Sequence, residues 1–219
     1  MKTDSEIQQD VADELNWDAA IDASKVEVTV KDSLVTLGGQ VSTLWEKWEA
    51  EQAVQRVAGV RSVVIKLDVA PLDAHSDADI AKAAQNVLSW VSGMPKDSIR
   101  IQVENSWVTL SGTVDWDYQR RKACSAVRYL SGVKGITDDI SIKSDSPAGE
   151  IKEDIEAALE RRLDADEQNI VVSVSGKNVT LSGTVTSWWQ RDRAFDSAWN
   201  APGVEQVTDH MVILSLIHI

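Results

Sequence analysis

Apolar residues recur four positions apart in three widely separated stretches, and each stretch is followed by strict alternation of apolar and polar residues. A four-residue spacing places side chains on one face of a helix, whereas alternation is typical of a strand with one buried face. The pattern therefore predicts a helix and then a strand, three times over. The helical positions are Ile7, Val11, Leu15; Ile80, Ala84, Leu88; and Ile151, Ile155, Leu159, and the alternating positions are Val26, Val28, Val30; Ile99, Ile101, Val103; and Ile170, Val172, Val174.

A heptapeptide recurs after each of these strands. It reads Val-Thr-Leu-Gly-Gly-Gln-Val at 35–41 and Val-Thr-Leu-Ser-Gly-Thr-Val at 108–114 and 179–185. Polar, turn-prone residues at 31–33, 104–106 and 175–178 lead into it, so each copy predicts a β-hairpin. A second glycine, followed by valine, stands twenty residues after the motif glycine in every copy, which indicates an internal repeat. We assign structural roles to these glycines, which are Gly39 and Gly59, Gly112 and Gly132, and Gly183 and Gly203.

A second helix is expected after the heptapeptide. Residues able to cap its first turn occupy matching positions in the three copies, and a small residue further on allows the helix to approach the sheet closely. The glycine of the Gly-Val pair suits the position just beyond the helix end, C′, which favours a positive φ. The expected caps are Ser42, Asp115 and Thr186, and the small residues are Ala50, Ala123 and Ala194.

A last apolar alternation completes each unit as α-β-β-α-β. We predict an α+β protein of three tandem domains at residues 3–70, 77–143 and 149–213, each a three-stranded sheet with two helices on one face. Polar, proline-bearing linkers join the domains at 70–76 and 143–148. The last strands contain Val63, Leu67, Val69; Ile136, Ile140, Ile142; and Val207, Met211, Ile213.

The C-terminal segment 214–219 resembles a read-through translation of a transposase sequencing adapter. We therefore expect it to be artefactual, with the natural chain continuing differently after about Ile213, and we assign no chemistry to His218.

The heptapeptide, the helix alanine and the Gly-Val pair together resemble the BON domain, named for bacterial osmotically inducible and nodulation proteins. The resemblance covers nearly the whole chain, three times. It implies the α-β-β-α-β fold and a non-catalytic role, usually described as attachment to phospholipid membranes or envelope components under osmotic or other stress.

Charge and composition narrow the possible partners. A net charge of −13 and a pI near 4.6 oppose nucleic-acid binding, which needs clustered cations. Cys124 is the only cysteine, so an intrachain disulfide and a cysteine-rich metal site are excluded. The N-terminus lacks the pattern of a secretory signal, and no apolar run is long enough to span a bilayer. We expect a cytoplasmic location, with the periplasm as the alternative if the N-terminus is incomplete.

Aromatic residues and cations gather at the start of the second helix in each copy. A ring and a cation beside a helix N-terminus suit a phosphate head group, because free amides and the helix dipole favour an anion there. The alternative is packing, in which the rings cover a small core and the cations form a solvated face. The candidate lipid or anion-binding residues are Trp45, Lys47, Tyr118, Arg120, Arg121, Trp189, Arg191 and Arg193.

The tryptophans away from the start of the second helices are expected to pack in cores or between domains; they are Trp17, Trp90, Trp107 and Trp199. The aromatic excess also fits a partner interface, where tryptophan and arginine are enriched, and the sequence does not separate these alternatives.

The sequence shows no pattern of residues that indicates a catalytic site. His75 and His210 have no neighbouring nucleophile in sequence. Cations near Cys124 would favour a reactive thiolate, although a small buried hydrophobic role is the more common one for such a residue. No metal or other cofactor is predicted.

The sequence thus predicts a non-enzymatic binding protein that uses repetition to raise its avidity for a surface. The first candidate partner is an anionic phospholipid or envelope surface. The second is a protein partner or another copy of the chain, bound by a soluble interaction module active in stress.

Overall fold

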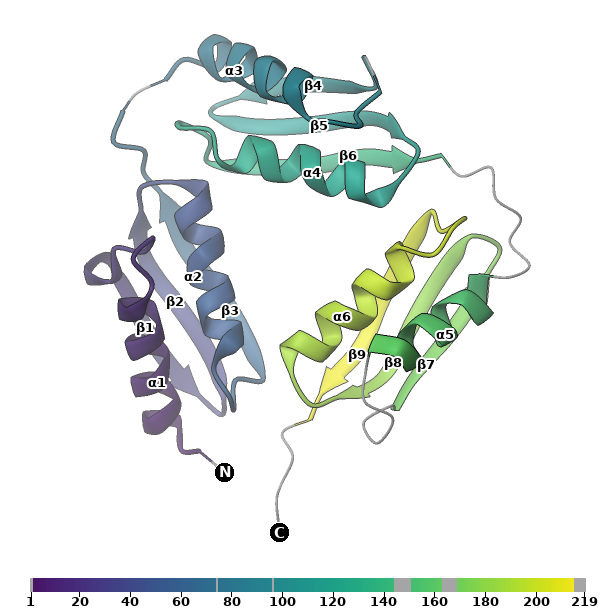
Figure 1. The fold of residues 1–219 in the computed structure, drawn as a ribbon. Coiled ribbons are helices and arrows are strands. Elements are labelled where there is room, and N and C mark those ends of the chain that lie inside the picture. Colours follow the sequence, from purple (N-terminus) through teal and green to yellow (C-terminus); the bar gives the residue numbers. More distant parts are fainter. Residues whose placement is uncertain (1, 74, 96, 144–150, 163–168, 215–219) are drawn as a thin grey trace. The chain divides into compact units, whose positions relative to one another are not determined.

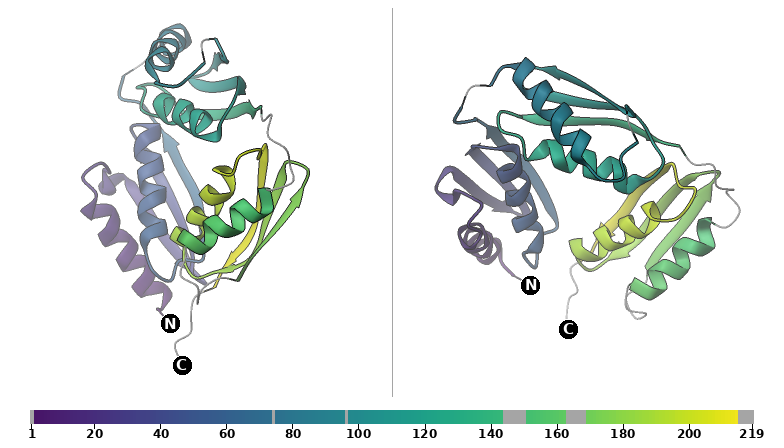
Figure 2. Two further views of the ribbon diagram at one scale, coloured as in Figure 1. Left: turned by 45° about the vertical axis from the view of Figure 1, so that its right-hand side comes forward. Right: turned by 45° about the horizontal axis from the view of Figure 1, so that its top comes forward.

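The computed structural model describes residues 2–73, 75–95, 97–143, 151–162 and 169–214. Each of three successive segments, here called modules 1, 2 and 3, contains a three-stranded sheet. Each module also has two α-helices, which lie on one face of its sheet (Figure 1, Figure 2). The predicted α+β fold of three tandem α-β-β-α-β units is therefore confirmed. Most of the predicted linker at 143–148 and residues 215–219 of the adapter-like tail lie outside the described residues.

Module 1 shows how the chain forms the sheet. The elements are α1 (Asp4–Trp17), a short 3-10 turn (Ala23–Lys25), β1 (Val26–Lys31), β2 (Leu34–Val41), α2 (Leu44–Arg56) and β3 (Ser62–Val69). Strand β2 lies in the centre, antiparallel to β1 and parallel to β3. Because parallel neighbours require a crossover, α2 returns the chain to the start of β3.

Modules 2 and 3 repeat this order. Module 2 comprises α3 (Asp77–Trp90), β4 (Ile99–Glu104), β5 (Trp107–Val114), α4 (Asp117–Arg128) and β6 (Gly135–Ile142). Module 3 comprises α5 (Ile151–Arg162), β7 (Asn169–Ser175), β8 (Asn178–Val185), α6 (Trp188–Trp199) and β9 (Gln206–Ile213). In both modules the middle strand of the three in sequence is also the middle strand of the sheet.

The core of each module lies between its helices and its sheet. In module 1, Ile7 and Leu15 of α1 and Leu37 of β2 are at most 2% exposed, so the predicted helical face is confirmed. The alternating residues of β1 are only partly buried because β1 is an edge strand. The shared alanines of the second helices, Ala50, Ala123 and Ala194, are fully buried, as expected for a close helix-to-sheet approach.

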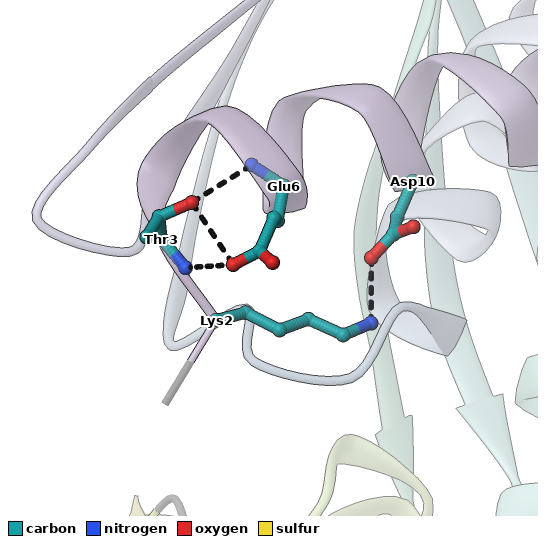
Figure 3. A network of polar contacts seen from close by, with 4 residues as sticks. All are labelled: Lys2, Thr3, Glu6 and Asp10. Atoms are coloured by element: carbon teal, nitrogen blue, oxygen red, sulfur yellow. Dashed lines mark hydrogen bonds and ion pairs between the residues drawn. The ribbon is translucent and has the colours of Figure 1, made fainter.

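A capping box fixes the start of α1 (Figure 3). The Thr3 hydroxyl accepts a hydrogen bond from the Glu6 amide at 3.3 Å, and the Glu6 carboxylate accepts from the Thr3 amide at 2.7 Å. Lys2 forms an ion pair with Asp10 at 2.6 Å beside it. These bonds satisfy amides that have no partner inside the helix. Ser76 and Asp79 repeat the capping box at the start of α3.

The second helices begin one residue later than predicted, so the prediction that Ser42 and Thr186 cap them was wrong. Thr43 caps α2 by accepting from the Glu46 amide at 3.0 Å, and Ser187 caps α6 by accepting from the Gln190 amide at 3.2 Å. Asp115 likewise lies two residues before α4 and is not at its capping position. All three predicted residues precede the capping position because the extended chain leaving the sheet runs one residue further.

A buried polar side chain occupies the third position of each second helix, and the sequence analysis missed it. Glu46 is 6% exposed and accepts hydrogen bonds from the amides of Ser42 and Asp22. Gln190 accepts from the amide and the hydroxyl of Thr186. In module 2, the buried Gln119 donates to the carbonyl of Gly93 at 2.6 Å. Each side chain therefore ties the helix start to neighbouring loop backbone.

The glycines of the Gly-Val pairs lie beyond the predicted C′ position, by one residue for Gly59 and by two residues for Gly132 and Gly203. Helix α2 ends with Val57 as its C-cap, and Gly59 follows in a turn closed by a bond from the Val60 amide to the Val57 carbonyl. The expected positive φ is present, with values of 100°, 86° and 96° at Gly59, Gly132 and Gly203. A positive φ at the third residue of a turn is the type II pattern, which favours glycine there.

The motif glycines face a different constraint. A Cβ atom built on Gly39 would lie 2.1 Å from the carbonyl oxygen of Lys25, and those on Gly112 and Gly183 would lie 2.0 Å and 1.9 Å from the carbonyls of Ser98 and Asn169. All three glycines also have a positive φ. The repeated glycine thus lets the edge strand begin in contact with the central strand.

Module 1 and most of module 2 belong to one compact unit, residues 1–114 and 119–140, and module 3 belongs to a second unit that also includes residues 115–118. No helix in the part of the chain that the structure describes is long and apolar enough to cross a bilayer.

Candidate functional site

The cation at the shared position of each second helix is engaged inside its own module. Lys47 donates from Nζ to the carbonyl of Leu67 in β3 at 2.7 Å. The cations at the same position in α4 and α6 pair with a carboxylate on the last strand. Arg120 Nε lies 3.7 Å from Asp138 Oδ2, and Arg191 Nε lies 2.7 Å from Asp209 Oδ2. These contacts hold helix to strand, so each of the three cations has a partner on the last strand of its own module.

The predicted aromatic partner in module 1 is also engaged. Trp45 stacks on Trp48 with ring centroids 4.8 Å apart and on Tyr129 of module 2 at 4.0 Å. The Arg128 guanidinium lies 4.9 Å from the centre of the Trp48 ring. Within the compact unit of modules 1 and 2, these residues form a layered aromatic contact between the two modules. This geometry matches the packing alternative for Trp45.

The other predicted residues remain on the surface. Tyr118 and Arg121 are exposed on α4, with 42% of Tyr118 accessible. Trp189 is 59% exposed, and the Arg193 guanidinium lies 4.7 Å from the centre of its ring. Arg191 instead lies 5.0 Å from the ring of Trp188. Module 3 therefore presents an exposed aromatic-cation pair, Trp189 with Arg193, at the start of α6.

Trp17 and Trp90 are the most exposed large apolar residues, at 86% and 87%, so the prediction that they pack was wrong. Each is the last residue of the first helix of its module. They lie two residues after the buried Leu15 and Leu88, which is a rotation of about 200° around a helix. That offset from the buried face was the available signal, and it places both indoles on the solvent side.

The surroundings of the two indoles differ in charge. A shallow depression beside Trp17 is lined by Asp10, Asp13 and Glu14 together with Lys2 and Arg56. The segment 88–95 around Trp90 reads Leu-Ser-Trp-Val-Ser-Gly-Met-Pro and carries no charged side chain. The end of α3, together with the turn that follows it, is therefore an apolar tip with no charged residue of its own, whereas the end of α1 is predominantly acidic.

The remaining two tryptophans of that prediction are packed. Trp199 is 7% exposed at the end of α6. Trp107 is half exposed, but its ring covers Gly135 and its indole N–H donates to the Thr137 hydroxyl at 2.8 Å.

Cys124 shows no sign of an activated nucleophile. Burial, together with the neighbouring Asp138 carboxylate, raises the pKa of the thiol to about 12, which outweighs the effect of Arg120 and Arg128. A thiol with so high a pKa stays protonated at neutral pH, and the protonated form is a poor nucleophile. His75 packs against Gly132, and His210 is exposed on β9. Among the residues that the structure describes, there is no group of three or more His, Cys, Asp or Glu side chains able to hold a metal ion.

Comparison with known proteins defines the class. The BON domain model matches the chain three times, at residues 3–71, 76–144 and 148–215, so the chain belongs to the BON domain family. A curated relative is osmotically-inducible protein Y of Escherichia coli (strain K12), which is 28% identical over 129 residues. That alignment covers 56% of this chain and 64% of the relative, so less than two thirds of the relative's length is matched.

Two solved structures also align with the chain. One is CdsD, a structural protein of the type III secretion system of Chlamydia trachomatis, at 15% identity, 95% coverage of this chain, 92% of CdsD and a TM-score of 0.28. The other is the PrgH periplasmic domain, at 14% identity, 92% and 98% coverage and a TM-score of 0.23. These scores are too low to support a further conclusion.

Proposed function

We propose that this protein is a non-catalytic, three-module binding protein that attaches to phospholipid membrane or envelope surfaces in an osmotic or related stress response. The observation that carries the proposal is the near-complete exposure of Trp17 and Trp90 at the same place in successive modules. Similarity to osmotically-inducible protein Y supports the stress context.

An indole in this position is suited to the boundary between water and lipid. Transfer of its large apolar ring system out of water is favourable, while its N–H can keep a polar partner near the head groups. A tryptophan buries about 150–250 Å² when it is covered. Both residues end a helix, so the indoles can enter a surface without unfolding the module.

Charge decides which module makes the main contact. The net charge of −13 opposes approach to anionic lipids, and the acids beside Trp17 increase this repulsion locally. The uncharged tip around Trp90 avoids it. Module 2 therefore leads the attachment, with Trp17 and the exposed pair of Trp189 and Arg193 adding weaker contacts that raise avidity.

The repeated polar residues support a non-catalytic role. The matched Lys47, Arg120 and Arg191 bind the last strands, and the matched Glu46, Gln119 and Gln190 bind backbone groups. These side chains hold the fold of each module together. The polar residues that are matched between modules therefore have structural roles.

Vesicle flotation of the full chain tests the proposal. Vesicles of phosphatidylcholine with phosphatidylglycerol should carry the protein upward and shift its tryptophan emission to shorter wavelength. Trp90→Ala should lower vesicle affinity about tenfold, and Trp17→Ala should have a smaller effect. The matched control is Leu72→Ala, which removes another side chain that is 84% exposed but does not end a helix.

The outcomes separate the two candidate functions. Equal flotation of wild type and the Trp17→Ala/Trp90→Ala double variant would contradict attachment through these indoles. Absence of flotation, with a mass by light scattering that rises with protein concentration, would instead favour self-assembly. The subcellular compartment stays a prediction, and fractionation of the native host tests it.

A further inference from the structure

Module 2 contains a groove of about 950 Å³ between its first helix and the edge of its sheet. Ala81, Lys82 and Gln85 of α3 form one wall, and Ile99, Arg100 and Ile101 of β4 form the other. Because β4 is an outer strand of the sheet, this wall includes backbone that has a neighbouring strand on one side only.

Modules 1 and 2 differ at a residue that lines this groove. In module 1, Gln8 extends from α1 and donates from its amide to the carbonyl of Val28 on the edge strand at 2.9 Å. The equivalent residues in module 2, 73 positions further along, are Ala81 and Ile101. The methyl group of Ala81 is too short to fill the space and has no donor for the Ile101 carbonyl.

The hairpin geometry shows which backbone groups face the groove. Asn105 and Ser106 form a two-residue turn with positive φ at both positions, so the flanking residues Glu104 and Trp107 are a hydrogen-bonded pair. Hydrogen-bonded and non-hydrogen-bonded pairs alternate along antiparallel strands. Ile99 and Ile101 therefore direct their N–H and C=O groups away from β5, as Val28 does in module 1 where Gln8 reaches it.

The charges of the walls identify the kind of segment that fits. The groove is lined by two basic residues, Lys82 and Arg100, and by one acidic residue, Asp97. The chain as a whole is strongly acidic. In module 1 the positions equivalent to Lys82 and Arg100 are Gln9 and Glu27. The cations at this edge of module 2 thus favour acidic side chains, while unpaired strand backbone favours an extended chain.

We propose that the groove between α3 and β4 binds an extended acidic segment of a partner protein, which adds to the sheet as a strand beside β4. Main-chain hydrogen bonds to Ile99 and Ile101 supply the register, and Lys82 and Arg100 select the charge. One end of the groove borders the tip around Trp90, since Leu88, Ser89, Met94 and Pro95 also line it, but Trp90 itself does not. The proposed recognition by Ile99, Ile101, Lys82 and Arg100 does not rest on the membrane function.

Fluorescence anisotropy on the full chain tests the proposal with a labelled octapeptide of alternating valine and glutamate. Ala81→Gln restores the side chain of module 1 at an accessible helix position and should raise the Kd of this peptide at least tenfold. Lys82→Glu leaves the groove open and should also weaken binding. The matched control is Gln8→Ala, which opens the equivalent space in module 1 without cations and should leave peptide binding unchanged.

Two altered peptides separate backbone pairing from simple charge attraction. A peptide with alternate backbone nitrogens methylated should not bind, because it lacks the strand donors. A peptide with lysine in place of glutamate should bind weakly.

Equal binding by wild type and a folded Ala81→Gln variant, equal binding of the methylated peptide, or no binding up to about 1 mM peptide would overturn the proposal. So would a dimer of the wild type that excludes the peptide and is lost in Ala81→Gln, since the strand edge would then pair with a second copy. The Ala81→Gln variant is expected to float with vesicles as wild type does. Failure of the peptide-binding proposal is therefore distinguishable from failure of the proposed membrane function.

Discussion

Arg191 on α6 and Asp209 on β9 form an ion pair, with Nε and Oδ2 2.7 Å apart and side chains 29% and 16% exposed. The helix crosses between two parallel strands, and this pair attaches it to the second of them. Lys47 reaches the equivalent strand of module 1 by bonding to a backbone carbonyl instead. The cation at this helix position therefore attaches the helix to the last strand in both modules, but through different partners.

The Arg191 pair predicts a loss of stability rather than a loss of ligand binding. Arg191→Gln should lower the unfolding free energy of module 3 by about 1 kcal/mol, since a partly buried charged hydrogen bond is removed. Urea denaturation measures the loss, and a double-mutant cycle with Asp209→Asn should show that the two effects are not additive. If Arg191→Gln lost vesicle flotation without any loss of stability, Arg191 would instead have a ligand-binding role.

The stack of Trp45 on Tyr129 predicts energetic coupling between modules 1 and 2. Tyr129→Ala should reduce their combined stability by about 0.5–1.5 kcal/mol, because an aromatic pair is lost. Tyr129→Phe keeps the ring and is expected to behave like wild type. Denaturation followed by tryptophan emission measures both variants. Identical unfolding curves for the alanine and phenylalanine variants would argue against coupling through this contact.

Adjacent glycines in β2 predict responses of very different size to the same substitution. Gly39→Ala places a Cβ 2.1 Å from the Lys25 carbonyl at a positive φ, so it should destabilise module 1 by about 2–4 kcal/mol. A Cβ on Gly38 meets nothing within 4 Å, and Gly38→Ala should change stability by less than about 0.5 kcal/mol. Thermal unfolding compares the two. Similar melting temperatures would show that the edge strand can move away.

Asp4 predicts part of the response of module 1 to acid. Hydrogen bonds from the backbone amides of Ser33 and Asp32 lower the pKa of the Asp4 carboxyl below 3.8. Because the folded state has the lower pKa, the stabilisation is present above the unfolded value and is lost as pH falls through the folded value. Acid unfolding followed by circular dichroism should therefore show that the stability of the Asp4→Asn variant depends less steeply on pH, below about pH 4, than that of wild type does. Parallel acid-unfolding curves would contradict this role.

Local pattern was sufficient to predict the repeat and the fold of each module. The spacing of Ile7, Val11 and Leu15 determines which helical face is buried, and the alternation along each strand determines which side meets the helices. These features depend on the geometry of one element at a time. The caps of the second helices were displaced by one residue because the pattern does not show where the extended chain ends and the helical turns begin.

Which side chains share a surface was decided only by the tertiary structure. Lys47, Arg120 and Arg191 look free in sequence, yet each finds its partner on a strand about twenty residues away. The groove of module 2 is lined by residues of both α3 and β4, so the pattern of either element alone does not reveal it. The amino-acid sequence by itself determined three copies of one hydrophobic framework, because burial follows the periodicity of each element. The availability of a polar or aromatic side chain for binding depends on contacts between elements, and folding alone brings those together.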